Sequence, residues 1–475
     1  MNSQKIEINP QFTEIMKKME EGKRHLFITG KAGTGKSTLL SYFCQNTNKK
    51  YVTLAPTGIA ALNVKGETIH RFFNFHIGVT PSRIISGEVK PKDPRLYSNL
   101  ETLIIDEVSM LRADLLDCIA TFLKKYGPNP EEAFGGIRMI FIGDLYQLPP
   151  VVTKKEKEIF NTRYQSPYFF DSHALKGLDL EIIELEKIYR QKEPEFIQLL
   201  NRIRDDSVES SDMKLLNQRC IEETTKDMNF EQTRSFSVWE EFIFWVIRFF
   251  GNLIKKFKQK ENMPCISLTS TNKQADQINI ECLATTKGKL YKSTAEISDD
   301  FDKNSYPTFV ELEYKVGAQI MMVNNDPNNR WANGSIGVIE KVNKDKDGEV
   351  YLVVRFPDKK TSYVVTKHKW EMFRHCFDGE KIELEVVGSF KQFPFKLAWA
   401  ITIHKSQGKT FNNVIIDIGS GTFATGQMYV ALSRCTSLKG IVLRTPIMRQ
   451  HIMADDRISK FLKKHQHQKS EKVLN

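Results

Sequence analysis

The chain has 475 residues, of which 40% are apolar and 27% are charged, and 31 of them are phenylalanines. This length and apolar content exclude a disulfide-stapled miniprotein and a disordered chain, and they predict two to four domains of about 100–200 residues each. Lys and Arg outnumber Asp and Glu by 69 to 58, a net charge of +11. That excess fits a polyanionic partner and fits a merely basic protein equally well.

Seven cysteines are scattered along the chain without a Cys-x-x-Cys pair or a zinc-ligand spacing. The first residues lack the apolar core of a secretory signal, and no run of about 18 apolar residues occurs. We therefore expect free thiols in a reducing compartment, and a soluble intracellular protein with no membrane span. It would lie in the cytoplasm or nucleoid of a bacterium, or in the nucleus of a eukaryote.

Short apolar runs alternate with helical patterns from residue 1 to about residue 185. Four of these runs end in Gly, Pro or acidic residues, as buried parallel strands do: His25–Thr29, Tyr51–Ala55, Thr102–Ile105 and Met139–Ile142. We therefore predict a first α/β domain over residues 1–185, whose ligands lie beyond the carboxyl ends of its strands.

A second set of strand patterns follows at Ile266–Ser270, Val414–Ile418 and Ile441–Arg444, and a helical pattern opens at Gly426. These segments predict a second α/β domain over residues 186–290 and 392–463. Residues 464–475 are predicted to form a mobile basic tail.

Between these segments, residues 291–391 show strand patterns that alternate with turn sequences such as Asn333-Gly334 and Asp347-Gly348. It predicts an inserted β subdomain. Its expected strands are Gln319–Val323, Ser335–Lys341, Val350–Phe356, Thr361–Lys367 and Lys381–Val387.

The segment 236–257 is apolar and aromatic on nearly all sides of a helical pattern. Glu240, Glu241 and Arg248 interrupt it and disfavour a membrane span. Two interpretations stay open, a buried helix and a surface that contacts a partner protein or a membrane.

Residues 30–37, Gly-Lys-Ala-Gly-Thr-Gly-Lys-Ser, form a complete phosphate-binding loop between a predicted strand and a predicted helix. Its glycines let backbone N–H groups wrap the phosphates, Lys36 reaches the terminal phosphates, and the Ser37 hydroxyl suits Mg²⁺. The predicted nucleotide-binding residues of this loop are Gly30, Lys31, Ala32, Gly33, Thr34, Gly35, Lys36, Ser37 and Thr38.

Two carboxylates, Asp106 and Glu107, follow the apolar run that ends at Ile105. Asp106 would hold Mg²⁺, and Glu107 would orient and deprotonate the attacking water. The same pattern alone often begins a helix, but behind a phosphate-binding loop the catalytic interpretation is favoured. The pair also argues against a small-molecule kinase, which needs no base for a hydrolytic water. Gln147, after the next strand, could sense the γ-phosphate.

Together these motifs resemble those of the Pif-one/RecD-like DNA helicases of superfamily one. The strings that carry the resemblance are GKAGTGKST, LAPTGIAALN with GETIHRFF, LIIDEVSML, GDLYQLPPV, LEKIYRQ, VGAQIMM with NGSIG, AITIHKSQG and YVALSR, in this order over residues 8–445.

The resemblance implies two RecA-like domains with ATP between them, and a motor that moves 5′ to 3′ on single-stranded DNA and opens duplex ends. Lys36, Glu107, Gln147, Arg190 and Arg434 would be catalytic, the last two as arginine fingers that link hydrolysis to domain closure. ATP and Mg²⁺ are the expected cofactors. Gln11, one place earlier than the family's adenine-binding glutamine, and Gly408 would complete the nucleotide site.

The resemblance also implies a grip on single-stranded DNA in each domain, and a monomer on DNA. The residues concerned are Pro56, Thr57, Gly58, Thr68 and His70 in the first domain, and Thr402, His404, Lys405 and Ser406 in the second. Rings such as Phe72, Phe73 or Phe75 could stack on bases, or could equally be core residues of a packed helix. A small wedge over residues 74–99 and an SH3-like barrel over residues 291–391 are expected by the same analogy.

A DNA-stimulated ATPase that remodels nucleoprotein without separating strands is the main alternative, because the same motor residues would serve it. An RNA motor also stays open. By the same analogy, the unwound substrate could include forks or G-quadruplexes, in DNA replication, repair, recombination or telomere maintenance. The preferred DNA structure and the pathway stay open.

Overall fold

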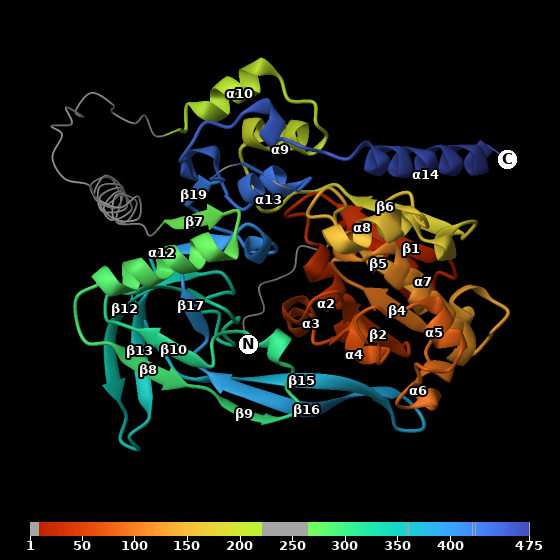
Figure 1. Ribbon diagram of the computed structural model, residues 1–475, viewed down its shortest axis with the longest axis horizontal. Helices are drawn as coiled ribbons and strands as arrows, with labels where there is room; N and C mark the ends of the chain where they lie inside the picture. Colours follow the sequence, from red (N-terminus) through yellow and green to blue (C-terminus); the bar gives the residue numbers. More distant parts are fainter. Residues whose placement is uncertain are drawn as a thin grey trace.

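The first domain is built on a six-stranded parallel sheet (Figure 1). The computed structural model describes residues 9–474, apart from 221–264 and the single positions 358, 360, 420 and 423. The sheet has the order β3-β2-β4-β5-β1-β6. Its strands are β1 (His25–Gly30), β2 (Tyr51–Ala55), β3 (Glu67–Thr68), β4 (Thr102–Ile105), β5 (Arg138–Ile142) and β6 (Leu180–Leu185). All four predicted strands are present.

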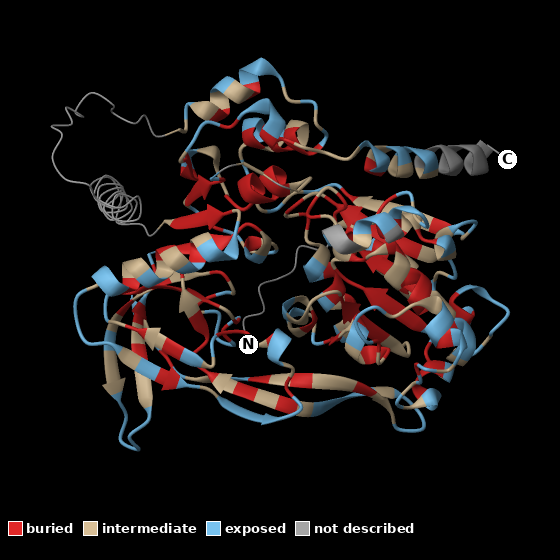
Figure 2. Cartoon of the chain, viewed as in Figure 1, coloured by how far each residue is buried: buried red, intermediate tan, exposed pale blue. Residues whose placement is uncertain are grey.

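This sheet is buried on both faces because apolar side chains occupy both sides of the pleat. Phe27, Leu103 and Ile105 belong to one core cluster, whereas Ile28 and Ile104 belong to another. Figure 2 shows the inner strands almost wholly buried, the edge strand β6 partly buried and the outer faces of the helices exposed. The helices of this domain are α1 (Pro10–Glu21), α2 (Lys36–Asn46), α3 (Gly58–Asn63), α4 (Ile69–Phe72), α5 (Pro81–Ile85), α6 (Pro94–Ser98), α7 (Ala113–Tyr126) and α8 (Lys154–Asn161).

The second domain has a four-stranded parallel sheet of order β18-β7-β19-β20. Its strands are β7 (Ile266–Thr269), β18 (Ala400–Thr402), β19 (Val414–Asp417) and β20 (Ile441–Leu443). Its helices are α9 (Pro194–Arg204), α10 (Ser210–Asn217), α12 (Asn272–Thr285) and α13 (Gln427–Ser433). The predicted α/β class is thereby confirmed for both domains. The aromatic segment 236–257 lies outside the described residues.

The inserted segment forms antiparallel sheets, the largest of order β14-β13-β12-β11-β17. The predicted strands correspond to β11 (Gln319–Met322), β12 (Ile336–Lys344), β13 (Val350–Arg355), β14 (Ser362–Val365) and β16 (Ile382–Gln392). Five further strands were not predicted: β8 (Tyr291–Thr294), β9 (Glu296–Asp299), β10 (Glu311–Tyr314), β15 (His368–Phe377) and β17 (Phe395–Leu397).

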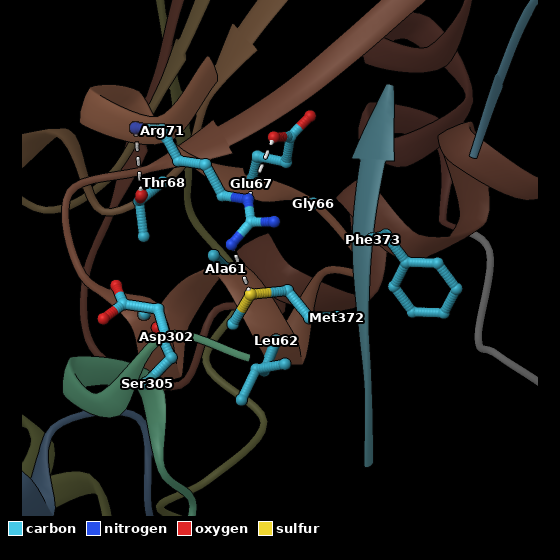
Figure 3. A pocket seen from close by; sticks show the side chains of 11 residues that line it. Ala61, Leu62, Gly66, Glu67, Thr68, Arg71, Asp302, Ser305, Met372 and Phe373 are labelled. Carbon is cyan, nitrogen blue, oxygen red and sulfur yellow. Dashed lines mark hydrogen bonds and ion pairs between the residues drawn. The ribbon is translucent and has the colours of Figure 1, made fainter. Parts of the chain in front are cut away.

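The long hairpin of β15 and β16 runs from the inserted subdomain to the first domain (Figure 1). There the buried Glu67 accepts hydrogen bonds from the backbone N–H of His375 at 2.7 Å, and its Oε1 lies 2.9 Å from His375 Nδ1. Arg71 pairs with Asp300, 2.8 Å away, and donates to Met372 Sδ. Figure 3 shows Glu67, Arg71 and Met372 among the side chains that line a small pocket between α3, α4 and the hairpin.

Helix α14 (Asp456–Leu474) follows the second domain but lies against the first (Figure 1). Ile458 is buried in the core cluster of the first domain, and the Phe461 ring stacks on that of Phe170 with centroids 4.5 Å apart. This helix includes most of the range predicted as a basic tail. Within the described residues, no helix is both long and apolar enough to cross a membrane.

Candidate active site between the two α/β domains

The phosphate-binding loop joins the end of β1 to the start of α2. Gly33 and Gly35 have φ angles of 83° and 88°, a left-handed conformation that glycine adopts without strain. Lys36, the first residue of α2, folds its side chain back over the loop and donates to the carbonyls of Gly30 at 2.6 Å and Lys31 at 3.0 Å. Burial lowers the pKa of Lys36, so the site presents an ammonium that a phosphate oxygen would stabilise.

The two acidic residues lie at the carboxyl end of β4, as predicted, and both are close to the loop. Burial and then the charge of Glu107 raise the pKa of Asp106 to about 7. Burial also raises the pKa of Glu107, although Lys36 and Arg434 counteract it. Glu107 has a φ of 50°, which is strained for a residue with a side chain. Such strain is typical of residues held in place for function.

Glu107 and Gln147 meet a side chain from the second domain that was not among the predicted site residues. Gln407 donates from Nε2 to Gln147 Oε1 at 3.0 Å and to Glu107 Oε2 at 3.4 Å. It precedes Gly408, which was predicted, in the same HKSQG string. The sequence signal that could have identified Gln407 was its position within this motif. Gln407 thus ties the Glu107 carboxylate to the second domain.

Both predicted arginine fingers lie beside this cluster. Arg434 is buried and donates from Nε to the Val430 carbonyl at 2.9 Å, from Nη2 to Ser433 Oγ at 2.8 Å, and from Nη1 to the Lys409 carbonyl at 3.3 Å. Arg190 donates to the Ser433 carbonyl at 3.2 Å. Burial, and then the neighbouring Arg190, lower the pKa of Arg434 to about 9. Two guanidinium groups are therefore crowded together where an anion would relieve their repulsion.

A second link between the domains is centred on the fully buried carboxylate of Asp144. Tyr429, on α13, donates to Asp144 Oδ2 at 3.3 Å, and its hydroxyl accepts the N–H of Ala32 in the phosphate-binding loop at 2.9 Å. Arg204, at the end of α9, lies 3.6 Å from Asp144 Oδ1 and stacks over the Tyr146 ring, 4.1 Å from its centroid. The motif strings contain Asp144 and Tyr429, but no sequence signal pointed to Arg204.

The Tyr429 hydroxyl is therefore expected to support nucleotide turnover. Tyr429→Phe removes both hydrogen bonds and leaves the Ala32 N–H without its partner, a loss of about 1–3 kcal/mol. We expect kcat/KM for ATP to fall about 5- to 100-fold, with no comparable fall in Tyr314→Phe, which alters a buried tyrosine of the inserted subdomain. Steady-state ATPase assays measure both variants. Equal kcat/KM in Tyr429→Phe and the unsubstituted protein would refute the link.

The predicted adenine residue Gln11 is held at the end of β6. Its Nε2 donates to the Glu184 carbonyl at 2.8 Å, and its Oε1 accepts the Glu186 N–H at 3.2 Å. The partly exposed Tyr189 ring faces Gly35 of the phosphate-binding loop, and its hydroxyl accepts from Asn9 Nδ2 at 3.1 Å. Tyr189, the neighbour of Arg190 in the IYRQ string, was not among the predicted site residues.

The predicted DNA contacts of the first domain begin two short helices beyond the ends of β2 and β3. Thr57, after Pro56, caps α3, and its Oγ1 accepts the Ala60 N–H at 3.3 Å. Thr68 caps α4 in the same way, and His70 follows it on the exposed side of that helix. A Cβ added at Gly58 would collide with Ser305 of the inserted subdomain. The insertion therefore covers the start of α3 in this structure.

The predicted DNA contacts of the second domain lie just after β18. Ser406 is buried and donates to the Ile403 carbonyl at 2.7 Å, whereas Lys405 is exposed, and its backbone N–H is accepted by Thr402 Oγ1 at 3.3 Å. His404 is half-buried beside them. Among the described residues, therefore, Lys405 is the group of this segment that most plainly faces solvent.

The three phenylalanines considered for base stacking are core residues. Phe72, Phe73 and Phe75 are 4%, 0% and 5% exposed, and the Phe73 ring contacts those of Tyr97 and Phe122. The structure therefore supports the packing alternative, because rings enclosed in this way offer no free face to a base.

The parallel sheets and the phosphate-binding loop define a RecA-like α/β protein of the P-loop class. The model of the PIF1-like helicase family matches residues 4–214. The human ATP-dependent DNA helicase PIF1 is 30% identical over 448 residues, which cover 92% of this chain and 61% of the human protein. The ATP-dependent DNA helicase Pif1 of Campylobacter jejuni is 27% identical over 437 residues, and the match covers 87% of each chain.

Solved structures of Bacteroides Pif1 agree with these matches at 32% sequence identity. The complex with ADP-AlF4 has a TM-score of 0.82 and the complex with single-stranded DNA a TM-score of 0.62, and each match covers 98% of both chains. The chain belongs to the PIF1-like helicase family, which confirms the resemblance found in the motifs. It spans 61% of the length of its human relative.

Proposed function

We propose that this protein is an ATP-dependent DNA helicase that moves 5′ to 3′ on single-stranded DNA and unwinds duplex ahead of it. The observation that carries the proposal is the interdomain cluster, in which Gln407 of the second domain donates to Glu107 of the first and Tyr429 of the second domain accepts a hydrogen bond from the phosphate-binding loop. A site shared in this way makes hydrolysis depend on the relative position of the domains. Relatives named as ATP-dependent DNA helicases support the same activity.

In hydrolysis, each side chain of the cluster has a definable role. The N–H groups of the loop and the Lys36 ammonium bind the phosphates, and Glu107 accepts the proton of the attacking water. Gln147 orients that water beside the γ-phosphate, and Arg190 and Arg434 neutralise the charge that develops on the transferred group. Gln407 holds the carboxylate of Glu107 in position until the nucleotide is bound.

Mg²⁺ fits the oxygen donors at this site. The exposed Ser37 hydroxyl and the buried Asp106 carboxylate are hard oxygen ligands, and a raised Asp106 pKa indicates a carboxylate that a cation would stabilise. When bound, the ion would neutralise phosphate charge. Gln11 would bind the adenine edge, and the Tyr189 ring, next to Gly35, would lie against the base. Gly408 would complete the nucleotide site from the second domain.

DNA would bind across both domains, along the starts of α3 and α4 and the segment after β18. N-terminal N–H groups and hydroxyls at these places suit phosphates and read no sequence. We assign the wedge to the segment that carries α5 and α6, and the SH3-like barrel to the sheet that contains β11–β14. Both would contact the duplex junction, and the protein would act as a monomer.

Tailed duplexes test this function. With ATP and Mg²⁺, we expect opening of a duplex that has a 5′ single-stranded tail and none of one that has a 3′ tail. Lys36→Ala should abolish opening because the terminal phosphates lose their cation, whereas the control Lys124→Ala, an exposed lysine on α7, should not. Stimulation of ATP hydrolysis by single strands without opening of either duplex would instead favour the translocase. Opening of RNA-tailed substrates alone would favour an RNA motor.

A further inference from the structure

Two lysines outside the predicted contacts, Lys396 and Lys409, lie near the predicted contact Lys405 where the inserted subdomain joins the second domain. Lys396 lies in the middle of β17, which leads through residues 398 and 399 directly into β18. Lys405 and Lys409 follow that strand. Because successive side chains of a strand point to opposite faces, the neighbouring Phe395 fills the core while Lys396 faces away from it.

Among the described residues, none of the three ammonium groups forms an ion pair. Lys409 Nζ instead donates to the neutral Asn333 Oδ1 at 2.7 Å. Burial, and then the charges of Lys405 and Lys409, lower the pKa of Lys396 to about 8, with only Asp276 opposing them. Like charges held together in this way raise the free energy of the protein unless an anion joins them.

An exposed aromatic ring lies next to these lysines. Phe309 is 56% exposed, the only phenylalanine among the described residues with a largely exposed side chain, and Lys396 Nζ lies 6.0 Å from its ring centroid. The preceding Thr308 is buried and donates to the Phe395 carbonyl at 2.6 Å, which fixes the loop of Phe309 against β17. The ring therefore has a defined position although one face is open to solvent.

We propose that Lys396, Lys405, Lys409 and Phe309 form an additional subsite for single-stranded DNA, in which the lysines bind backbone phosphate and Phe309 stacks on a base. A phosphate grip beside an open aromatic face suits a single strand, because the bases of a duplex are already stacked on one another. The subsite is continuous with the segment after β18, to which the proposed function assigns the strand. This inference rests on that proposed function and adds the inserted subdomain to the DNA path.

Equilibrium binding of a labelled oligothymidylate to the full-length chain, over a range of salt concentrations, tests the subsite. Lys396→Met should weaken binding about tenfold, and should reduce the slope of log affinity against log salt by about 0.7, the value for one phosphate contact to a single strand. Phe309→Ala should weaken binding about 5- to 150-fold, the range for loss of one stacked base, with the slope unchanged.

Controls separate the subsite from a structural role. Lys396→Arg keeps the positive charge and should keep the affinity for oligothymidylate and the salt slope. Lys292→Met removes an exposed, ion-paired lysine from β8 and should change neither quantity. The melting temperature of Lys396→Met should equal or exceed that of the unsubstituted protein, because one of three like charges is removed. A lower melting temperature together with an unchanged salt slope would show a structural role and overturn the proposal.

Three further outcomes would also overturn it. Wild-type affinity and slope in both Lys396→Met and Phe309→Ala, in a protein that opens 5′-tailed duplexes, would refute the subsite and leave the proposed function intact. Stabilisation by inorganic phosphate that Lys396→Met abolishes, without an effect on oligothymidylate binding, would identify a site for free anions. If the unsubstituted protein binds no single strand, the proposed function fails together with the subsite.

Discussion

Glu107→Gln is expected to lower kcat for ATP hydrolysis about 10²–10⁴-fold, the usual contribution of a positioned general base. The amide keeps the shape of the side chain and can still pair with Gln407, but it cannot accept the proton of the attacking water. ATP binding should therefore persist, and DNA unwinding should be lost with hydrolysis. Single-turnover hydrolysis and binding of a fluorescent ATP analogue measure the two steps separately.

A matched control lies at the opposite end of the same strand. Glu101 is exposed and immediately precedes β4, whereas Glu107 lies just beyond its carboxyl end. Glu101→Gln removes a carboxylate of the same type and should retain full activity. If Glu107→Gln hydrolyses ATP within tenfold of the unsubstituted rate, another group must be the base, and the role assigned to Glu107 is wrong.

Arg434→Ala is expected to lower kcat about 10³–10⁵-fold, as loss of an arginine finger does in comparable enzymes. The side chain lies near the Glu107 carboxylate, and all three of its nitrogens are engaged by its own domain. The bond from Nη1 to the Lys409 carbonyl is the longest of the three, at 3.3 Å, so we expect Nη1 to be the nitrogen that turns towards a bound phosphate. ATP affinity should change only a few-fold, because the phosphate-binding loop is untouched.

Because Arg434 is buried, its replacement can also disturb folding, so two further measurements accompany it. Arg434→Lys keeps the charge but not the planar fork, and it should remain well below the unsubstituted rate. Arg449→Ala removes a half-exposed arginine that is ion-paired with Asp206 in the same domain and should keep the ATPase rate. A folded Arg434→Ala protein, judged by its melting curve, with more than a tenth of normal kcat would contradict the finger role.

Local patterns predicted much of the two central sheets. Buried strands such as β1, β4 and β19 are short runs of apolar residues, and their identity depends only on the adjacent sequence. The phosphate-binding loop is likewise a local feature of the sequence, because its glycines and Lys36 lie within a few residues of one another. For the same reason the order of motifs was sufficient to identify the family.

Strands with mixed polarity were harder to predict. Strand β15 alternates incompletely between buried and exposed residues, because one part of it packs in the insertion and another against the first domain. Its pairing with β16 is a local hairpin, but its contact with Glu67 joins residues 308 positions apart, and no local pattern encodes that contact. The aromatic pattern near Phe73 allowed two interpretations, base stacking and packing in the core. The structure favours packing, because these rings are enclosed in the core.

The sequence by itself determined the α/β class, the phosphate-binding loop, the carboxylates after β4 and the family, because each depends on residue types at short spacing. Only the tertiary structure decided that Gln407 reaches Glu107, that Arg204 and Tyr429 meet at Asp144, and that Lys396 lies beside Phe309. The first two sets of contacts join residues up to 300 positions apart, and the last joins β17 to a loop before β10. Such contacts arise from the packing of domains, which no short window of sequence contains.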